Sequence, residues 1–168
     1  LMSNAIGESI ARVFEHSGAK VIRANYQGDV GPHVAKAIWG KIQKPEMSWG
    51  EAYVYGTESY EAHKEEIDEI NKKVYSRSDP AVDSLYDAGR KLSLEHFEEL
   101  YKMLGTSFDH YFFESKAGPL GLEIIQKHPE VFEESEGAII FRGEKYGLHT
   151  RVFVNKLGLP TYEAKDLG

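Results

Sequence analysis

The fold is decided by residues 6–31, which read IGESIARVFEHSGAKVIRANYQGDVG. Apolar side chains recur at helical spacing in the first part, so the sequence predicts a helix over Ile6–Ser17. The face expected to be buried consists of Ile6, Ile10, Val13 and Phe14. Lys20–Tyr26 then alternates as a strand would, and it runs into the glycine loop Gly28–Gly31. A helix and a strand that lead into such a loop predict an open α/β sheet with a ligand crevice at the loop.

Composition limits the classes of protein to which the chain can belong. Its 168 residues suffice for one domain with a sizeable core. The formal net charge of −7 argues against binding nucleic acid by bulk electrostatics. Cysteine is absent from the sequence, which excludes disulfides, a thiolate nucleophile and a zinc–thiolate site. No stretch resembles a signal peptide or a membrane span, so we expect no membrane association and a cytoplasmic location.

The rest of the chain alternates predicted helices with predicted strands. Helices are predicted over residues 32–44, 58–77, 81–91, 93–104 and 119–128, and from residue 161 onward. Strands are predicted over residues 108–113 and 151–155, with a hairpin formed by residues 131–132 and 138–141. Residues 48–60 receive no firm assignment. This alternation favours an α/β fold with a helical insertion.

Several residues define these predicted boundaries. Ser93 has the chemistry of an N-cap, and Gly105 that of a residue closing a helix. Pro119 is expected to start a helix, and Gly158 to occupy a left-handed turn position. The charge-dense helix over 58–77 has only a narrow apolar stripe. We therefore expect it to be exposed and less protected from hydrogen exchange than residues 6–26.

Residues 1–15, Gly18 and residues 21–31 resemble arginyl-tRNA synthetases, which are class I aminoacyl-tRNA synthetases. The runs that carry the likeness are LMSNAIGESIARVFE, Gly18 and VIRANYQGDVG. The resemblance implies part of a Rossmann-like nucleotide-binding fold with a mainly helical connective insertion. It implies a first part of the catalytic domain over residues 1–44, the insertion over 45–90 and the continuation of the catalytic domain over 91–168.

Tyr162 and Asp166 are the candidate substrate-binding residues. They lie four positions apart, so on a helix they share one face, where a carboxylate beside a phenol suits a guanidinium. From spacing alone, such a pair is more often surface decoration. The segment NKLGLPTYEAKDL, residues 155–167, resembles the family segment that builds the arginine pocket, which implies that this pair binds arginine. Ala164 and Lys165 replace the threonine and arginine common in the family, and we expect little effect on the pocket.

Gly28, Asp29 and Gly31 match the family loop at the rim of the active site. An alternative reading remains open for this loop: a tight strand-to-helix turn in which Asp29 caps the following helix. Residues 108–115, FDHYFFES, also resemble a family stretch, although a core strand would explain them equally well. The seven histidines show no metal-ligand spacing, and we predict no metal site and no catalytic residue.

The resemblance implies a ligase that joins arginine to tRNA. ATP and arginine would first give arginyl-adenylate and pyrophosphate, and the arginyl group would then move to tRNA; Mg²⁺ is expected to accompany ATP. Positioning and electrostatic stabilisation of the phosphates would supply most of the catalysis. The family's His-Ile-Gly-His and Lys-Met-Ser-Lys-Ser motifs do not occur in this sequence, so we expect the isolated chain to be inactive. The alternative is a non-catalytic, synthetase-like module that binds an arginine-like ligand or a protein partner.

Overall fold

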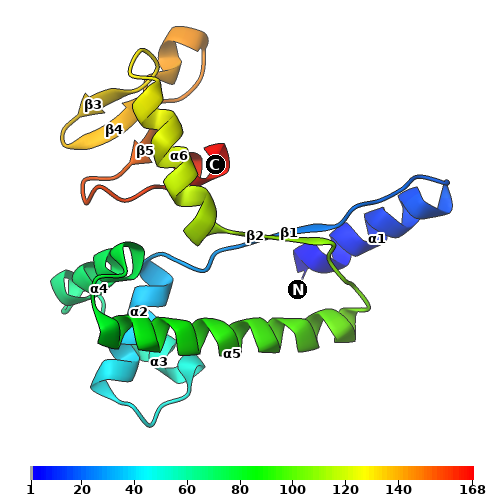
Figure 1. Cartoon of the computed structure of the whole chain (residues 1–168), viewed down its shortest axis with the longest axis horizontal. Coiled ribbons are helices and arrows are strands. Elements are labelled where there is room, and N and C mark those ends of the chain that lie inside the picture. The colour runs from blue at the N-terminus through cyan, green and yellow to red at the C-terminus, as the bar shows by residue number, and fades with distance from the viewer. Residues whose placement is uncertain (1) are drawn as a thin grey trace.

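The computed structural model describes residues 2–168, and Leu1 lies outside the described part. A short parallel pair of strands, β1 (Ala24–Gln27) and β2 (His110–Phe113), lies at the centre of the molecule (Figure 1). On one side of the pair lie α2 (Pro32–Gln43), α3 (Trp49–Glu58), α4 (Lys64–Ser76) and α5 (Pro80–Leu104). On the other side lie α6 (Glu114–Lys127), an antiparallel sheet and α7 (Tyr162–Leu167). The predicted α/β class is confirmed.

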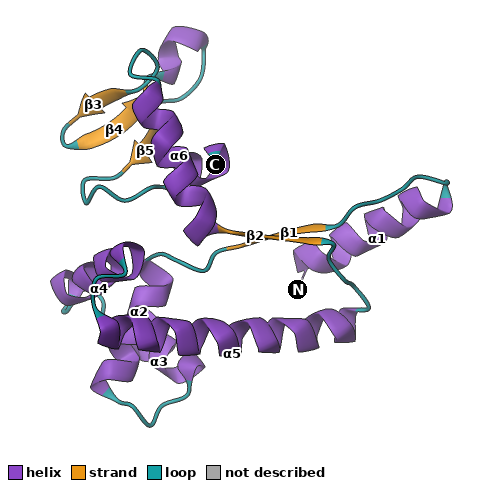
Figure 2. Ribbon diagram, viewed as in Figure 1, coloured by secondary structure: helices purple, strands orange, loops and turns teal. Residues whose placement is uncertain are grey.

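The antiparallel sheet follows α6 and has the order β3–β4–β5 (Figure 2). Its strands are β3 (Glu133–Ser135), β4 (Ala138–Phe141) and β5 (Arg151–Val154), and the short 3₁₀ helix η1 (Gly143–Tyr146) separates the last two. The predicted hairpin is confirmed, because β3 and β4 pair through a turn at Glu136 and Gly137, both with positive φ. The first strand of the hairpin begins two positions later than predicted.

The main hydrophobic core belongs to the helices α2, α4 and α5. Ile38, Trp39, Ile67 and Val74 are almost completely buried in it, with Tyr86 beside them. The apolar stripe predicted within residues 58–77 therefore exists, but it packs into this core instead of lying on a loosely attached helix. Residues 48–60 have no firm assignment from sequence patterns, and most of them, Trp49–Glu58, form α3. Ser48 and Glu51 begin this helix with a reciprocal capping box.

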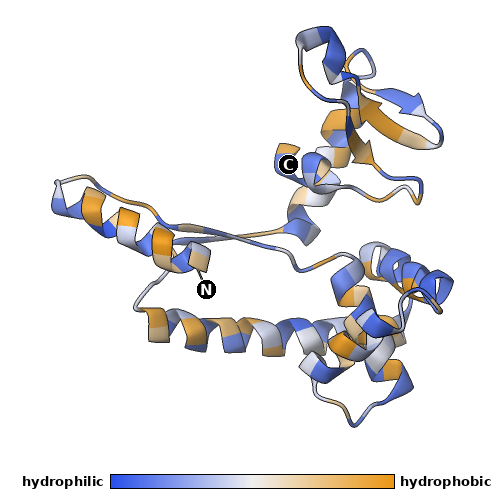
Figure 3. Cartoon of the chain, turned by 180° about the vertical axis from the view of Figure 1, so that it is seen from behind, coloured by the Kyte–Doolittle hydropathy of each residue, from blue (hydrophilic) through white to orange (hydrophobic). Residues whose placement is uncertain are grey.

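Helix α1 (Met2–His16) is present as predicted, but the prediction that its apolar face is buried is wrong. Ile6, Ile10, Val13 and Phe14 are 52–68% exposed. Hydrophobic segments, in orange, alternate with hydrophilic ones along this helix in Figure 3. The polar side of α1 holds it in place. Glu8 accepts hydrogen bonds from Arg23 and Thr106, and the bond from Arg23 is the main reason that its pKa falls to about 2.

Two predicted helix starts are wrong. Residues 80–104 form one continuous helix, and Ser93 lies in its middle on an exposed position where serine is tolerated. Helix α6 begins at Glu114, directly after β2, so Pro119 lies inside the helix. The predicted closing role of Gly105 is confirmed by its φ of 66°, and that of Gly158 by its φ of 76°.

Three smaller expectations have mixed outcomes. The strand predicted from Lys20 begins only at Ala24, and β2 is largely exposed, although its aromatic residues predicted a buried strand. Thr161 occupies the N-cap position of α7, but its hydroxyl donates to carbonyl oxygens of β5 instead of capping the helix.

Every helix over residues 2–168 is too short or too polar to cross a lipid bilayer.

Hydrogen exchange should be faster in α1 than in α4, the reverse of the expectation from sequence. Helix α4 buries Ile67, Ile70 and Val74, whereas Ala11 is the buried residue of α1. Opening of α1 therefore exposes little apolar surface. After correction for intrinsic rates, we expect residues 6–16 to exchange at least roughly ten times faster than residues 67–76. Exchange measured by mass spectrometry would contradict this packing if both peptides were equally protected.

The contact between α2 and α3 should not tolerate a methyl group at its two closest points. A Cβ at Gly40 would lie 2.2 Å from the carbonyl oxygen of Ala52, and one at Gly56 would lie 2.1 Å from that of Lys36. We expect Gly40→Ala and Gly56→Ala each to lower the free energy of unfolding by about 1–3 kcal/mol, measured by urea denaturation.

Gly50→Ala is the matched control, because nothing lies within 4 Å of a Cβ there and the residue is also in α3. Alanine is the better helix former, so this variant should be neutral or more stable by up to about 1 kcal/mol. Equal destabilisation by all three substitutions would contradict the close approach of α2 and α3.

Candidate active site

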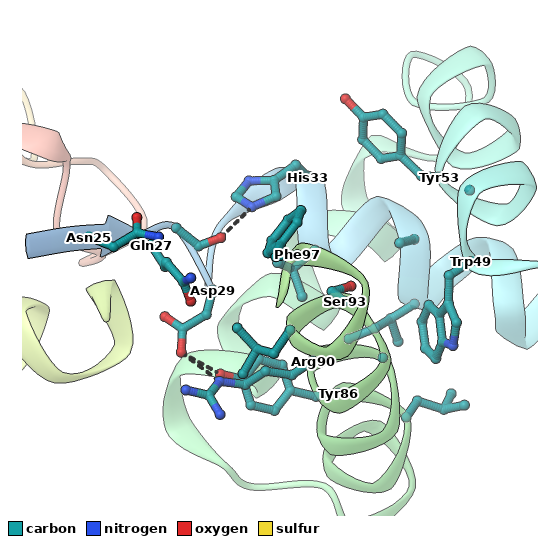
Figure 4. A pocket seen from close by; sticks show the side chains of 18 of the residues that line it. Asn25, Gln27, Asp29, His33, Trp49, Tyr53, Tyr86, Arg90, Ser93 and Phe97 are labelled. Atoms are coloured by element: carbon teal, nitrogen blue, oxygen red, sulfur yellow. Dashed lines mark hydrogen bonds and ion pairs between the residues drawn. The ribbon is translucent and has the colours of Figure 1, made fainter. Parts of the chain in front are cut away.

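Asp29 is the centre of the loop between β1 and α2. It is nearly buried, and its carboxylate accepts four hydrogen bonds from two other elements. From α5, Arg90 Nε donates at 2.9 Å and the Tyr86 hydroxyl at 3.3 Å (Figure 4). From α6, Ser115 donates from its hydroxyl at 2.7 Å and from its backbone N–H at 2.9 Å. Asp29 therefore joins the β1–α2 loop to both long helices.

The reading of Asp29 as the cap of the following helix is wrong. The N-cap of α2 is Gly31, without a side-chain capping bond, and Asp29 instead satisfies an N–H in the first turn of α6. Burial raises the pKa of Tyr86 to about 12, and the negative charge of Asp29 adds to this effect. Tyr86 therefore remains a protonated hydrogen-bond donor to Asp29 at neutral pH.

The structure requires glycine at one of the two glycine positions of the loop. Gly31 has φ of 131° with ψ of −178°, a conformation that side chains rarely adopt. A Cβ at Gly28 would lie 3.5 Å from the carboxyl carbon of Glu114, which is ordinary van der Waals contact. The carbonyl oxygen of Gly28 lies 3.1 Å from Nε2 of His33, which places that histidine beside the loop (Figure 4). The predicted rim residues Gly28, Asp29 and Gly31 thus lie together at the carboxyl end of β1.

Glu114 and Lys165 form a buried ion pair that sequence patterns do not reveal. Their side chains are 4% and 6% exposed, and Lys165 Nζ lies 2.6 Å from Glu114 Oε2. Burial is the largest single influence and lowers the pKa of Lys165, but the hydrogen bond and charge of Glu114 together with Tyr75 outweigh it, so the pKa is raised. The ammonium also lies near the rings of Tyr162 and Tyr75, at 5.3 and 5.9 Å from their centroids. Helices α4, α6 and α7 therefore meet at one positive charge.

Tyr162 and Asp166 lie on α7, as their spacing predicts, and both are exposed. Asp166 forms no ion pair with any residue of the described range 2–168. It lies close enough to Tyr26 to affect that hydroxyl. Burial raises the pKa of Tyr26, and the charges of Glu114, Asp166 and Asp29 raise it further. Asp166, Glu114 and Asp29 are thus all near enough to Tyr26 for their charges to act on its hydroxyl.

A cavity of about 800 Å³ lies between β1 and the helices α2, α3 and α5. Its walls include Asn25 and Gln27 from β1 and aromatic residues such as Trp49 and Phe97 (Figure 4). Gly28 and Asp29 contribute to its edge, whereas Tyr162 and Asp166 do not line it. The predicted rim residues therefore border a different space from the predicted arginine-binding pair.

The described residues do not provide a metal site. Within residues 2–168, no group of three or more histidine, aspartate or glutamate side chains is arranged to hold a metal ion. The nearby carboxylates of Asp29 and Glu114 are already bound by Arg90 and Lys165. These two carboxylates are therefore not free to act as magnesium ligands.

Curated proteins are similar in sequence to the chain over nearly its whole length. An arginine–tRNA ligase from Lactobacillus acidophilus is 32% identical over 189 residues, which cover 99% of this chain and 32% of the relative. One from Lactobacillus delbrueckii is 30% identical over 180 residues, again covering 99% of this chain and 32% of the relative. The chain thus spans about a third of the length of the curated relatives that it matches.

Two solved structures and a family model that are similar to the chain are also of arginyl-tRNA synthetases. Arginyl-tRNA synthetase from Plasmodium falciparum superposes with a TM-score of 0.69 at 22% identity, over 96% of this chain and 29% of that one. A putative arginyl-tRNA synthetase from Campylobacter jejuni superposes with a TM-score of 0.59 at 20% identity, over 96% of this chain and 38% of that one. These likenesses confirm a fold of the Rossmann-like synthetase type. The model described as "tRNA synthetases class I (R), catalytic domain" matches residues 1–168, and the chain belongs to this family.

Proposed function

We propose that this chain is the part of an arginine–tRNA ligase that selects arginine. In the whole enzyme, arginine and ATP give arginyl-adenylate and pyrophosphate, and the arginyl group is then transferred to tRNA. Family membership and relatives named arginine–tRNA ligase support this activity and do not favour a non-catalytic binding module. The proposal includes a cytoplasmic location, and a helical insertion over residues 45–90 within the catalytic fold.

The observation that carries the proposal is the electrostatic setting of Asp166. Three carboxylates influence Tyr26, but Asp29 and Glu114 are each compensated by a buried or half-buried cation. Asp166 is the one of the three without an ion pair among residues 2–168. A carboxylate that is left without a cation is suited to a guanidinium, which can donate two parallel N–H bonds to it.

Neighbouring contacts would position this carboxylate. Lys165 precedes Asp166 in the chain, and its buried bond to Glu114 fixes α7 against the start of α6. Tyr162 lies one helical turn earlier and presents an exposed ring on the same face. In our proposal, Asp166 binds the guanidinium of arginine and the ring of Tyr162 packs beside it. We assign no contact with ATP or tRNA to individual residues of this chain.

Asp166→Asn should selectively weaken arginine binding in the whole enzyme that contains this chain. The substitution keeps the size of the side chain but removes the charge that faces the substrate cation. Loss of a charged hydrogen-bond partner costs about 1.5–3 kcal/mol, which corresponds to a rise of roughly 10- to 100-fold in the KM for arginine. The KM for ATP should change much less. Arginine-dependent ATP–pyrophosphate exchange measures both constants.

Glu163→Gln is the matched control, since it neutralises a carboxylate on the same helix that lies 3.8 Å from Arg151 instead of at the proposed site. Tyr162→Phe retains the ring and should have a smaller effect than Asp166→Asn. If Asp166→Asn left the KM for arginine unchanged, or if Glu163→Gln raised it equally, α7 would not bind arginine as proposed.

A further inference from the structure

Lys165 connects the helix of the proposed arginine site to a helix on the other side of the strand pair. Its Nζ lies 5.9 Å from the centroid of the Tyr75 ring, and Tyr75 belongs to α4. Figure 1 shows α4, with α2 and α5, on one side of β1 and β2, and α6 on the other side. Helix α7, which carries Lys165, packs against α6. The contact between Tyr75 and Lys165 therefore spans two parts of the molecule.

The ammonium of Lys165 has a second tyrosine ring as a neighbour. This is the ring of Tyr162, whose centroid lies 5.3 Å from Nζ. A cation within about 6 Å of a ring centroid is attracted by the negative face of the ring, most strongly where water is excluded. The side chain of Lys165 is only 6% exposed, so its charge is largely removed from water. Lys165 thus links Tyr75 of α4 to the ring that we assign to the arginine site.

Tyr162 needs such a contact to keep a fixed orientation. The residue is 68% exposed on α7, and exposed side chains change rotamer rapidly unless a contact holds them. Lys165 lies over one face of the Tyr162 ring and leaves the other face for a guanidinium. Its ammonium is held in turn by Glu114, at 2.6 Å. The orientation of Tyr162 therefore depends on where the ammonium is held.

Tyr75 is well placed to help hold the ammonium. It packs against the main core, beside Val74, which is almost completely buried. Burial raises the pKa of the Tyr75 hydroxyl, so the side chain is neutral at neutral pH and contributes a ring and a dipole, not a negative charge. A buried ammonium is costly unless polar or aromatic groups surround it. Tyr75 supplies one of these groups from a rigid part of the molecule.

The backbone of α7 is held in place without Tyr75. A Cβ at Gly121 would lie 1.8 Å from the carbonyl oxygen of Ala164, and one at Gly168 would lie 2.0 Å from that of Ala117. The backbones of α6 and α7 are therefore in direct contact at both points. Loss of the Tyr75 ring should leave α7 where it is and affect mainly the side chains of Lys165 and Tyr162.

We propose that Tyr75 is a positioning residue for arginine, which acts through Lys165 on the ring of Tyr162. This inference rests on the proposed role of Tyr162 and Asp166 in binding arginine. Tyr75 limits the movement of the ammonium, and the ammonium holds the Tyr162 ring where it packs beside the guanidinium. Tyr75 itself contacts neither arginine nor ATP.

Tyr75→Met tests this proposal in the whole enzyme that contains this chain. Methionine keeps a large apolar side chain in the core but removes the ring. We expect the KM for arginine to rise about three- to tenfold, the range of one partly buried cation–ring contact. The kcat and the KM for ATP should be unchanged. Tyr75→Phe keeps the ring and should restore the KM for arginine, as measured by arginine-dependent ATP–pyrophosphate exchange.

Tyr162→Ala shows whether Tyr75 acts through the Tyr162 ring. This substitution should raise the KM for arginine by itself. Adding Tyr75→Met should then raise it no further, because two residues that act through one contact are not additive.

Tyr60→Met is the matched control. Tyr60 packs against the same core, but its hydroxyl donates to Asp68 and its ring contacts Lys36 instead of Lys165. Its KM for arginine should equal that of the wild type. Circular dichroism verifies folding, and Tyr75→Leu is a second variant that removes the ring, in case Tyr75→Met does not fold.

Several results would overturn the positioning role of Tyr75. One is an unchanged KM for arginine in the folded ring-removing variants while Tyr162→Ala raises it. Another is an equal rise on adding Tyr75→Met to Tyr162→Ala, and a third is an equal rise in Tyr60→Met or Tyr75→Phe. If Tyr162→Ala and Asp166→Asn both leave the KM unchanged, the proposed arginine site itself is wrong, and this inference fails with it.

Discussion

The carboxylate of Asp29 holds the parts of this molecule together. Moving an ionised carboxylate out of water is costly unless it is paired and hydrogen-bonded, and here donors from α5 and α6 meet both requirements. Gly31, two positions after Asp29, adopts a positive φ at which the backbone turns into α2. The loop before α2 thus acts as the junction of three helices that are far apart in sequence.

Features that depend on local chemistry could be predicted from the sequence. The β3–β4 turn, the closing position of Gly105 and the turn at Gly158 each depend on residues next to one another, and all three are confirmed. The start of α6 could not be predicted in this way. It is set by Asp29, 86 positions before Ser115, whereas sequence patterns pointed to the nearby Pro119. The exposed face of α1 is a similar case, because the contacts of Glu8 on its opposite side decide the orientation of the helix.

The candidate site also has features that depend on neighbouring residues and features that depend on distant ones. The shared helix of Tyr162 and Asp166 follows from their spacing and is confirmed, whereas their binding of arginine stays a prediction. Lys165 looked like a neutral replacement between them, but the structure makes it the buried partner of Glu114, 51 positions away. The hydrogen bond from the amide nitrogen of Gln27 to the Tyr101 hydroxyl is likewise long-range, because Tyr101 lies near the end of α5. Long-range pairing of this kind leaves no mark in the spacing of residues.

The uninterrupted course of α5 has a mechanical consequence. A helix of 25 residues is about 37 Å long. At one end, α5 contributes Val82 and Tyr86 to the core that it shares with α2 and α4, and its other end leads into β2. Arg90, bound to Asp29 part way along, gives the helix a pivot. A tilt of α5 by about 5° around Arg90 would move its last residue, Leu104, by about 2 Å if the helix turned as a rigid rod. A movement of α2 and α4 would thus be transmitted along α5 to the segment that leads into β2.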